Sequence, residues 1–198
     1  MAERESGKAG AGLDTDLLSA VARAELAAMG LDTAGGDAPA RVDGLEPVAD
    51  RAAVAKRAIS APEVLNEAYD YGIPSSFSRG MRVELPGASM LYLSGTASVD
   101  DRGETVHEGD FAAQCLRTFR NLTRLLAAEK ASWHDVIRTT CYLRDIERDY
   151  ELFNLVRTDF MDRIGLDPLP ASTAIQARIC RTDLLVEIEA IAVIPGGA

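Results

Sequence analysis

Residues 184–193 read LLVEIEAIAV, and this density of Leu, Val and Ile predicts a strand in the middle of a sheet. Side chains alternate between the two faces of a strand, which puts Val186, Ile188, Ala190 and Ala192 on one face and Glu187, Glu189 and Ile191 on the other. Glutamates are rarely buried unless they are paired, and burial without a partner raises the pKa of a carboxyl group. The two glutamates therefore face water, pair with cations or line a site that uses a proton.

The segments before this strand complete the pattern of an α/β (α+β) domain with element order β-β-α-β-α-β-β. Pro86-Gly87 is typical of a hairpin turn, and Asp110 is placed to cap a long amphipathic helix. Because both predicted helices are amphipathic, we expect them to cover one face of a single sheet. The predicted strands cover residues 81–85, 90–94, 136–143, 173–179 and 184–193, and the predicted helices cover residues 111–126 and 149–164.

The opposite face of the sheet combines apolar and charged side chains. Alternation along residues 173–179 leads us to expect Gln176 and Arg178 on the same face as Glu187 and Glu189. Such a face is too apolar for free solvent and too charged for a core, so it favours an oligomer interface that contains a wet cavity. A structural ion pair between Arg178 and either glutamate is the plainer alternative.

The first 68 residues differ in composition from the rest of the chain. No aromatic residue precedes Tyr69, and this segment is rich in Ala, Gly and Asp. A helix from Asp14 or Asp16 to about Met29 is expected, and a second helix over residues 48–59. We interpret residues 1–68 as an N-terminal extension, partly helical or disordered, and residues 74–195 as the main domain.

Composition limits the possible functions. A formal net charge of -10 argues against a nucleic-acid partner, and no apolar run approaches the length of about 20 residues that crosses a bilayer. The N-terminus lacks the basic and apolar regions of a signal peptide, and three widely spaced cysteines suit a reducing cytoplasm. With two histidines and no clustered ligands, a metal site is not expected.

Several motifs, in order and with similar spacing, resemble the Rid (YjgF/YER057c/UK114) family over residues 74–193. The resemblance implies a chorismate-mutase-like fold, homotrimers with pockets in the clefts between subunits, and a small-molecule substrate. It also implies hydrolysis of reactive enamines or imines, such as 2-aminoacrylate, without a metal or an organic cofactor. The matching motifs are LYLSG at 91–95, Gln114, Asn121-Leu122, DVIRTT at 135–140, Phe153-Asn154, Pro170-Ala171 and VEIEAIA at 186–192.

The family's functional positions are carried over one at a time. The water-activating glutamate of the family falls on Glu187, which makes this residue the candidate general acid or base. The serine of the S-G turn falls on Ser94, beside Gly95, whose lack of a side chain permits close approach of a ligand. The pocket asparagine falls on Asn154, and the pocket tyrosine falls near Phe77, which lacks the hydroxyl group.

The sequence departs from the family after Pro170-Ala171. Deaminating members carry an arginine there, which binds the substrate carboxylate through two hydrogen bonds, whereas this chain has Ser172 followed by Thr173. We therefore expect poor 2-aminoacrylate deaminase activity. The replacement cation is left open among Arg178, Arg181 and Arg79.

A second resemblance concerns the C-terminal half of chorismatases. It rests on SGTAS at 94–98, TVHEGD at 105–110 and CRTDLLVE at 180–187. The combined expectation is a Rid-like enzyme of specialised metabolism that acts on an imine, enamine or enol ether. Two alternatives stay open: a non-catalytic metabolite-binding or pathway-partner protein, and a chorismatase-like hydrolase or lyase.

Overall fold

The computed structural model describes residues 19–28, 54–71 and 75–196, and it divides the chain into two units, residues 1–53 and 54–198. In the first unit, helix α1 (Ala20–Ala28) lies within the predicted first helix, and the Oγ of Ser19 accepts a hydrogen bond from the N–H of Ala22. The expected start at Asp14 or Asp16 lies outside the described residues. All functional candidates belong to the second unit.

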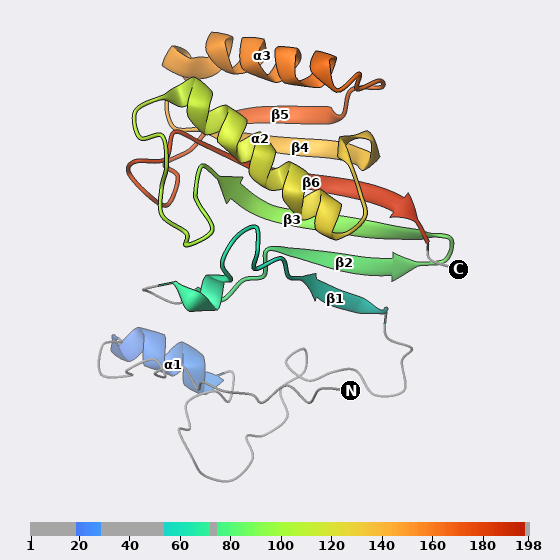
Figure 1. The fold of residues 1–198 in the computed structure, drawn as a ribbon. Helices are drawn as coiled ribbons and strands as arrows, with labels where there is room; N and C mark the ends of the chain where they lie inside the picture. Colours follow the sequence, from blue (N-terminus) through green and yellow to red (C-terminus); the bar gives the residue numbers. More distant parts are fainter. Residues whose placement is uncertain (1–18, 29–53, 72–74, 197–198) are drawn as a thin grey trace. The chain divides into compact units, whose positions relative to one another are not determined.

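Within its described residues, the second unit is built on one six-stranded sheet with strand order β1-β2-β3-β6-β4-β5 (Figure 1). Only β4 and β5 pair in parallel, and the other neighbours are antiparallel. The predicted order β-β-α-β-α-β-β is confirmed for β2 to β6, and β1 precedes it. The strands are β1 (Lys56–Ile59), β2 (Gly80–Leu85), β3 (Ala88–Ala97), β4 (Val136–Leu143), β5 (Ala171–Gln176) and β6 (Val186–Pro195).

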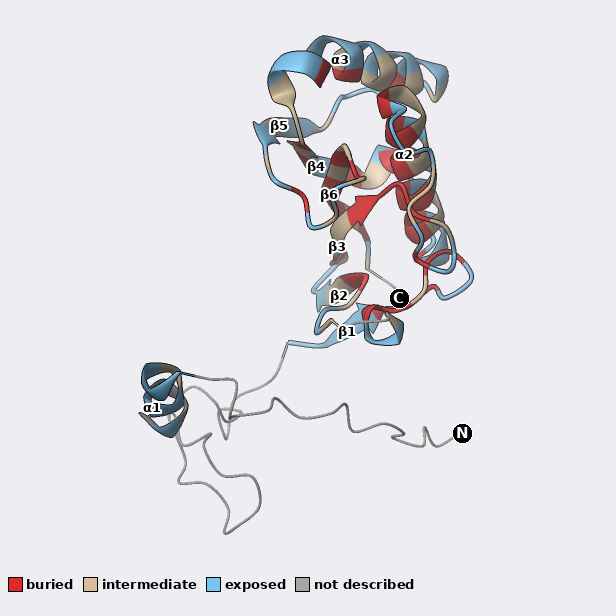
Figure 2. Cartoon of the chain, turned by 90° about the vertical axis from the view of Figure 1, so that its left-hand side faces the viewer, coloured by how far each residue is buried: buried red, intermediate tan, exposed pale blue. Residues whose placement is uncertain are grey.

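Two long helices cover one face of the sheet, as expected (Figures 1 and 2). Helix α2 (Phe111–Ala128) begins after Asp110, whose side chain accepts a hydrogen bond from the N–H of Ala113, as the sequence predicts. Helix α3 (Ile146–Arg163) is capped in the same way by Asp145 and so begins three residues before the predicted start at Asp149. Two short 3-10 helices lie elsewhere in the described chain: Ala68–Asp70 between β1 and β2, and Trp133–Asp135 between α2 and β4. No helix in the described ranges is long and apolar enough to span a membrane.

The core lies between this helical layer and the sheet. Strand β6 alternates strictly between buried and half-buried residues, which confirms that Glu187 and Glu189 share the face turned away from the helices. The core residues are almost fully buried, and they include Val186, Ile188, Ala190 and Ala192 from the helix-facing side of β6 and Phe119, Leu122, Leu125 and Leu126 from α2.

The compact unit begins at Val54, twenty residues before the boundary expected at residue 74. Residues 56–59, expected as the end of a helix, form edge strand β1, which pairs antiparallel with β2; residues 48–53 lie outside the described ranges. The absence of aromatic residues was a poor guide because aliphatic side chains anchor this segment. The buried anchors are Ile59, Ala61, Val64, Leu65 and Ala68.

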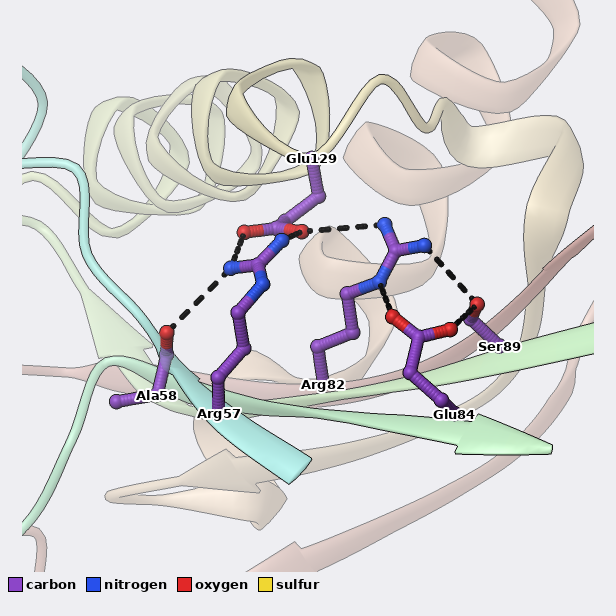
Figure 3. Close-up of polar contacts among 6 residues, drawn as sticks. All are labelled: Arg57, Ala58, Arg82, Glu84, Ser89 and Glu129. Carbon is purple, nitrogen blue, oxygen red and sulfur yellow. Dashed lines mark hydrogen bonds and ion pairs between the residues drawn. The ribbon is translucent and has the colours of Figure 1, made fainter. Parts of the chain in front are cut away.

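Charged side chains also tie β1 to the helical layer (Figure 3). Arg57 donates two hydrogen bonds, of 2.8 and 2.6 Å, to the buried carboxylate of Glu129, which follows α2. Arg82 on β2 adds a longer contact of 3.4 Å to the same carboxylate and pairs with Glu84 at 2.6 Å. The network joins the first two strands to the C-terminal end of α2.

The predicted orientation of β5 is wrong. Gln176 faces the helices, because its Oε1 accepts a hydrogen bond from the N–H of Ile146 at the start of α3, and Ala174 packs against the core. Thr173 and Ile175 share the open face instead. Alternation gave the wrong face for Ile175 because β5 is an edge strand. At the edge of the sheet an apolar side chain can stay partly exposed, and Ile175 is 42% exposed. Arg178 lies beyond the end of the strand, and the described residues contain no ion pair between it and either glutamate.

Candidate active site

A β-bulge in β3 shapes the candidate site. Leu93 pairs with Ala190 and Thr96 pairs with Ile188, so Ser94 and Gly95 together oppose a single residue of β6. Bulges re-aim side chains and are common beside active sites. The bulge brings the backbone of the predicted S-G turn next to the predicted glutamate.

The backbone of Gly95 lies directly against the carboxyl group of Glu187. A Cβ built on Gly95 would lie 1.9 Å from Oε1 of Glu187 and 2.9 Å from its Cδ. No side chain fits at position 95 while the carboxyl group stays where it is. Glycine therefore serves here to admit the Glu187 carboxyl group against the backbone of β3.

The carboxyl group of Glu187 opens into a cavity of about 470 Å³, a volume typical of small-molecule sites. Loop residues before β2 and after β5 form the walls, and the bulge forms part of the floor. Besides Glu187 and Gly95, the polar and aromatic residues of the lining are Tyr71, Ser75, Phe77, Arg79, Thr96, Cys180 and Arg181.

Burial raises the pKa of Glu187 above its ordinary value of 4.5, and the nearby negative charge of Glu189 raises it further. The described residues contain no ion pair to Glu187 that would oppose this effect. A carboxyl group in this state holds its proton closer to neutral pH, as a general acid requires.

Ser94 lies beside this cavity, not in its lining. Its hydroxyl group donates a 2.7 Å hydrogen bond to the backbone oxygen of Ser78, and its backbone N–H donates to the oxygen of Arg79. Ser94 instead lines a neighbouring hollow of about 330 Å³, which also contains Glu189 and Tyr92. The two glutamates of β6 therefore open into two different depressions on the same face.

Asn154 and Ser172 form a separate cluster around Arg157 of α3. Arg157 donates hydrogen bonds to Asn154 Oδ1 at 2.6 Å and to Ser172 Oγ at 3.1 Å, and its guanidinium lies 4.9 Å from the ring centroid of Phe153. None of these residues lines the cavity of Glu187. The chain thus brings Glu187, Gly95 and Phe77 together, and it places Asn154 and Ser172 elsewhere.

Two further candidates also lie outside the cavity. Thr173 is on the open face of β5, where its Oγ1 accepts a 3.5 Å hydrogen bond from Arg138, and Arg178 is exposed after that strand. Of the three arginines considered as a replacement cation, the cavity contains Arg79 and Arg181. In the described part of the chain, no group of three or more His, Cys, Asp or Glu side chains is placed to hold a metal ion.

Tyr71 and Arg157 were not predicted from the sequence. Tyr71 falls in the segment assigned neither to the extension nor to the main domain, so no periodic pattern marked it. Arg157 follows Asn154 by three residues, and residues at this spacing on a helix share a face. That spacing was the available signal for Arg157.

The chain combines an α+β fold, a bulged sheet and a cavity that contains one glutamate and two arginines. A family model described as endoribonuclease L-PSP matches residues 75–194, more than half of the chain, and the chain therefore belongs to this family, the Rid (YjgF) family. The family and the fold expected from the sequence are confirmed.

Two curated relatives have named activities. A chorismatase from Streptomyces rapamycinicus is 36% identical over 126 residues, which are 60% of this chain and 36% of the relative. The 3-aminoacrylate deaminase RutC of Acinetobacter baylyi is 29% identical over 104 residues, 52% of this chain and 79% of the relative. This chain thus covers about a third of the chorismatase and most of the deaminase.

Solved structures share the fold. Escherichia coli TdcF with bound serine is 25% identical with a TM-score of 0.56, and the match covers 70% of this chain and 98% of TdcF. The YjgF gene product of Escherichia coli gives the same identity and TM-score, with 69% and 98% coverage. Both matches cover almost the whole of the solved chains, which places the similarity in the Rid domain.

Proposed function

We propose that this protein is a small-molecule hydrolase that acts on an imine, enamine or enol ether, with Glu187 as its general acid and base. The observation that carries the proposal is the carboxyl group of Glu187, held against Gly95 in a cavity and with a raised pKa. The named activities of the two relatives, deamination of 3-aminoacrylate and the chorismatase reaction, support the same class of chemistry.

The proposed reaction begins when protonated Glu187 gives its proton to the carbon–carbon double bond of an enamine or enol ether. This transfer creates an iminium or oxocarbenium carbon. Water adds to that carbon, and the carboxylate of Glu187 accepts a proton from the water. Glu187 then returns this proton to the nitrogen or oxygen of the leaving group and accepts the proton of the new hydroxyl group, so that cleavage of the C–N or C–O bond releases ammonia or an alcohol and leaves a ketone.

We further propose that the open face of the sheet is covered in a homotrimer, with the cavities in the clefts between subunits. This face carries exposed apolar side chains, among them Tyr92 at 40% and Ile175 at 42% exposure. A neighbouring copy would then bring its own Arg157, Asn154 and Ser172 near an interface. Sedimentation of a stable monomer at micromolar concentration would contradict this assembly.

The test of the proposed reaction compares Glu187→Gln with Glu189→Gln, a matched substitution on the same face of the same strand. Ammonia release is measured from imines formed in situ by an amino-acid oxidase, and alcohol release from alkyl enol ethers. We expect Glu187→Gln to lose turnover and Glu189→Gln to keep most of it. Full turnover by Glu187→Gln would reject the assignment, and ligand binding without turnover by the wild type would favour the non-catalytic alternative.

A further inference from the structure

Arg79 is a buried cation whose hydrogen-bond partners among the described residues are all neutral. Its side chain is 4% exposed. Its Nε donates a 2.8 Å hydrogen bond to the backbone oxygen of Asn66, and its Nη2 donates to that oxygen, to Asn66 Oδ1 and to Tyr71 Oη. Among the described residues no carboxylate pairs with it. Burial of a charge that lacks a counter-ion costs free energy, so an anion beside Arg79 would be stabilised.

Arg181 brings a second cation to the same tyrosine. The guanidinium carbons of Arg79 and Arg181 lie 5.1 and 5.7 Å from the ring centroid of Tyr71. Arg181 donates a hydrogen bond from Nη1 to the backbone oxygen of Gly103, which anchors the guanidinium and leaves its Nε and Nη2 without a bond to the described residues. Both arginines line the cavity of Glu187.

Among the described residues that line this cavity, positively charged side chains outnumber negatively charged ones. Two guanidinium groups face one carboxyl group, Glu187, and the described lining contains no other acidic side chain. Because burial favours the neutral form of Glu187, the excess of positive charge is not offset when that residue holds its proton. The aromatic rings of Tyr71 and Phe77 supply part of the apolar wall of the cavity.

We propose that Arg79 and Arg181 form an anion subsite, which binds the carboxylate of a substrate whose carbon skeleton is a flat, unsaturated ring or chain. The proposal rests on the function proposed above and names its substrate class. Guanidinium groups bind carboxylates through paired, charge-assisted hydrogen bonds, and the carboxylate supplies the missing counter-ion. The flat skeleton lies against Tyr71 and Phe77, within reach of Glu187.

The size of the cavity favours a substrate larger than a three-carbon amino acid. About 470 Å³ lies within the range of drug-sized ligand pockets, and a three-carbon compound would leave much of it to water. An aromatic or conjugated carboxylate fills more of this space and buries apolar surface against the two rings.

The experiment titrates the full chain with phenylpyruvate and with phenylacetone, its neutral analogue without the carboxylate, by isothermal calorimetry. We expect Arg181→Gln to weaken phenylpyruvate binding by about tenfold or more, the typical effect of losing a charge-assisted contact, and to leave phenylacetone binding unchanged. Arg79→Lys serves as the second variant, because it keeps the positive charge but removes the planar guanidinium group that donates two parallel hydrogen bonds to a carboxylate. Arg163→Gln on the exposed face of α3 is the matched control.

The outcomes separate this subsite from the proposed reaction. Equal phenylpyruvate affinity in the wild type, Arg181→Gln and Arg79→Lys would overturn the subsite, whatever the turnover. No preference of the wild type for phenylpyruvate over phenylacetone would overturn it as well. Weaker binding in both arginine variants, together with full turnover by Glu187→Gln, would keep the subsite and reject the reaction.

Discussion

Gly95 and Glu187 are complementary: the space that a Cβ of residue 95 would fill is occupied by Oε1 of Glu187, at 1.9 Å. The β-bulge in β3 makes this fit possible, because it turns the backbone of Gly95 toward β6. The position of the proposed acid is therefore set by a residue without a side chain. A change at Gly95 tests that relationship without removing the carboxyl group.

Gly95→Ala should displace the carboxyl group of Glu187 and lower kcat/KM by about 100-fold, the scale of loss expected from a misplacement of about 1 Å. The fold should survive, because the obstructing atom is the end of a flexible side chain. Gly80→Ala is the matched control: its Cβ would lie 2.6 Å from the backbone oxygen of Tyr92, so it should lower the Tm instead. Unchanged kcat/KM in Gly95→Ala would contradict the proposed role of this contact.

The raised pKa of Glu187 predicts a pH dependence of stability. Because folding favours the protonated form, Glu187 stabilises the protein fully below its ordinary pKa of 4.5, and this contribution is lost as pH rises through the folded pKa. The nearby charges are Glu189, which raises the pKa, and the cavity residues Arg79 and Arg181; Tyr142 pairs with Glu187 on β4. Relative to Glu187→Gln, the wild type should lose free energy of unfolding as the pH of urea titrations rises above 4.5. A constant difference between the two proteins would contradict this prediction.

Truncations locate the boundary of the compact unit. A chain that starts at Val54 should keep the Tm of the second unit. A chain that starts at Glu67 lacks Ile59, Val64 and Leu65, and burial of each such side chain is worth about 1.5–3 kcal/mol. The loss approaches the whole stability of a small domain, so this shorter chain should be unfolded in circular dichroism. A cooperative transition at the same Tm in both chains would restore the boundary near residue 74.

Arg57 and Glu129, which belong to the ion-pair network at β1, should contribute unequally to the free energy of unfolding (Figure 3). Arg57→Ala should cost about 0.5–1 kcal/mol, because the Arg57 side chain is 55% exposed. Glu129→Ala should cost about 2 kcal/mol or more, because it leaves both Arg57 and the half-buried Arg82 without this carboxylate. Chemical denaturation of the two variants and of their double mutant measures the coupling. Equal costs would show that Arg82 gains nothing from Glu129.

The parts of the fold that were predictable are those in which local pattern and burial agree. The alternation of β6 and the cap at Asp110 follow from short-range physics, and both are confirmed. Strand β1 was not predictable in this way, because its four residues, KRAI, carry no alternation and gain their stability from pairing with β2 and from Glu129.

The candidate site was predictable to a similar extent. Glu187 and Gly95 were identified through motif resemblance, and the bulge brings them together. Tyr71 contacts Arg79 through a tertiary hydrogen bond that no sequence period encodes, whereas the helical spacing of Arg157 from Asn154 was a signal but its contact with Ser172 was not. The face of Gln176 was misassigned because an edge strand tolerates an exposed isoleucine at position 175.

The wild type should be a weak 2-aminoacrylate deaminase. We expect from the resemblance to the Rid family that Ser172 stands at the position of the carboxylate-binding arginine of deaminating members. In this chain Arg157 donates a 3.1 Å hydrogen bond to the hydroxyl group of Ser172 and a 2.6 Å hydrogen bond to Oδ1 of Asn154. A bidentate, charge-assisted contact is worth about 1.5–3 kcal/mol, so the wild type should clear 2-aminoacrylate about 10- to 100-fold less efficiently than an arginine-bearing Rid protein.

Position 172 lies outside the Glu187 cavity of its own chain, so a gain from an arginine there requires the proposed homotrimer, in which a neighbouring copy would bring this position to the cavity. Ser172→Arg alone places a second guanidinium beside Arg157, and repulsion between the two cations should keep the gain small. The double variant Ser172→Arg with Arg157→Gln removes the competing charge, and it should raise kcat/KM by about tenfold, equivalent to 1.4 kcal/mol. Arg157→Gln alone is the control, and an aminoacrylate-clearance assay measures all three variants. If Ser172→Arg alone gains as much as the double variant, Arg157 does not obstruct this position. If the wild type matches an arginine-bearing Rid protein, another cation already binds the carboxylate.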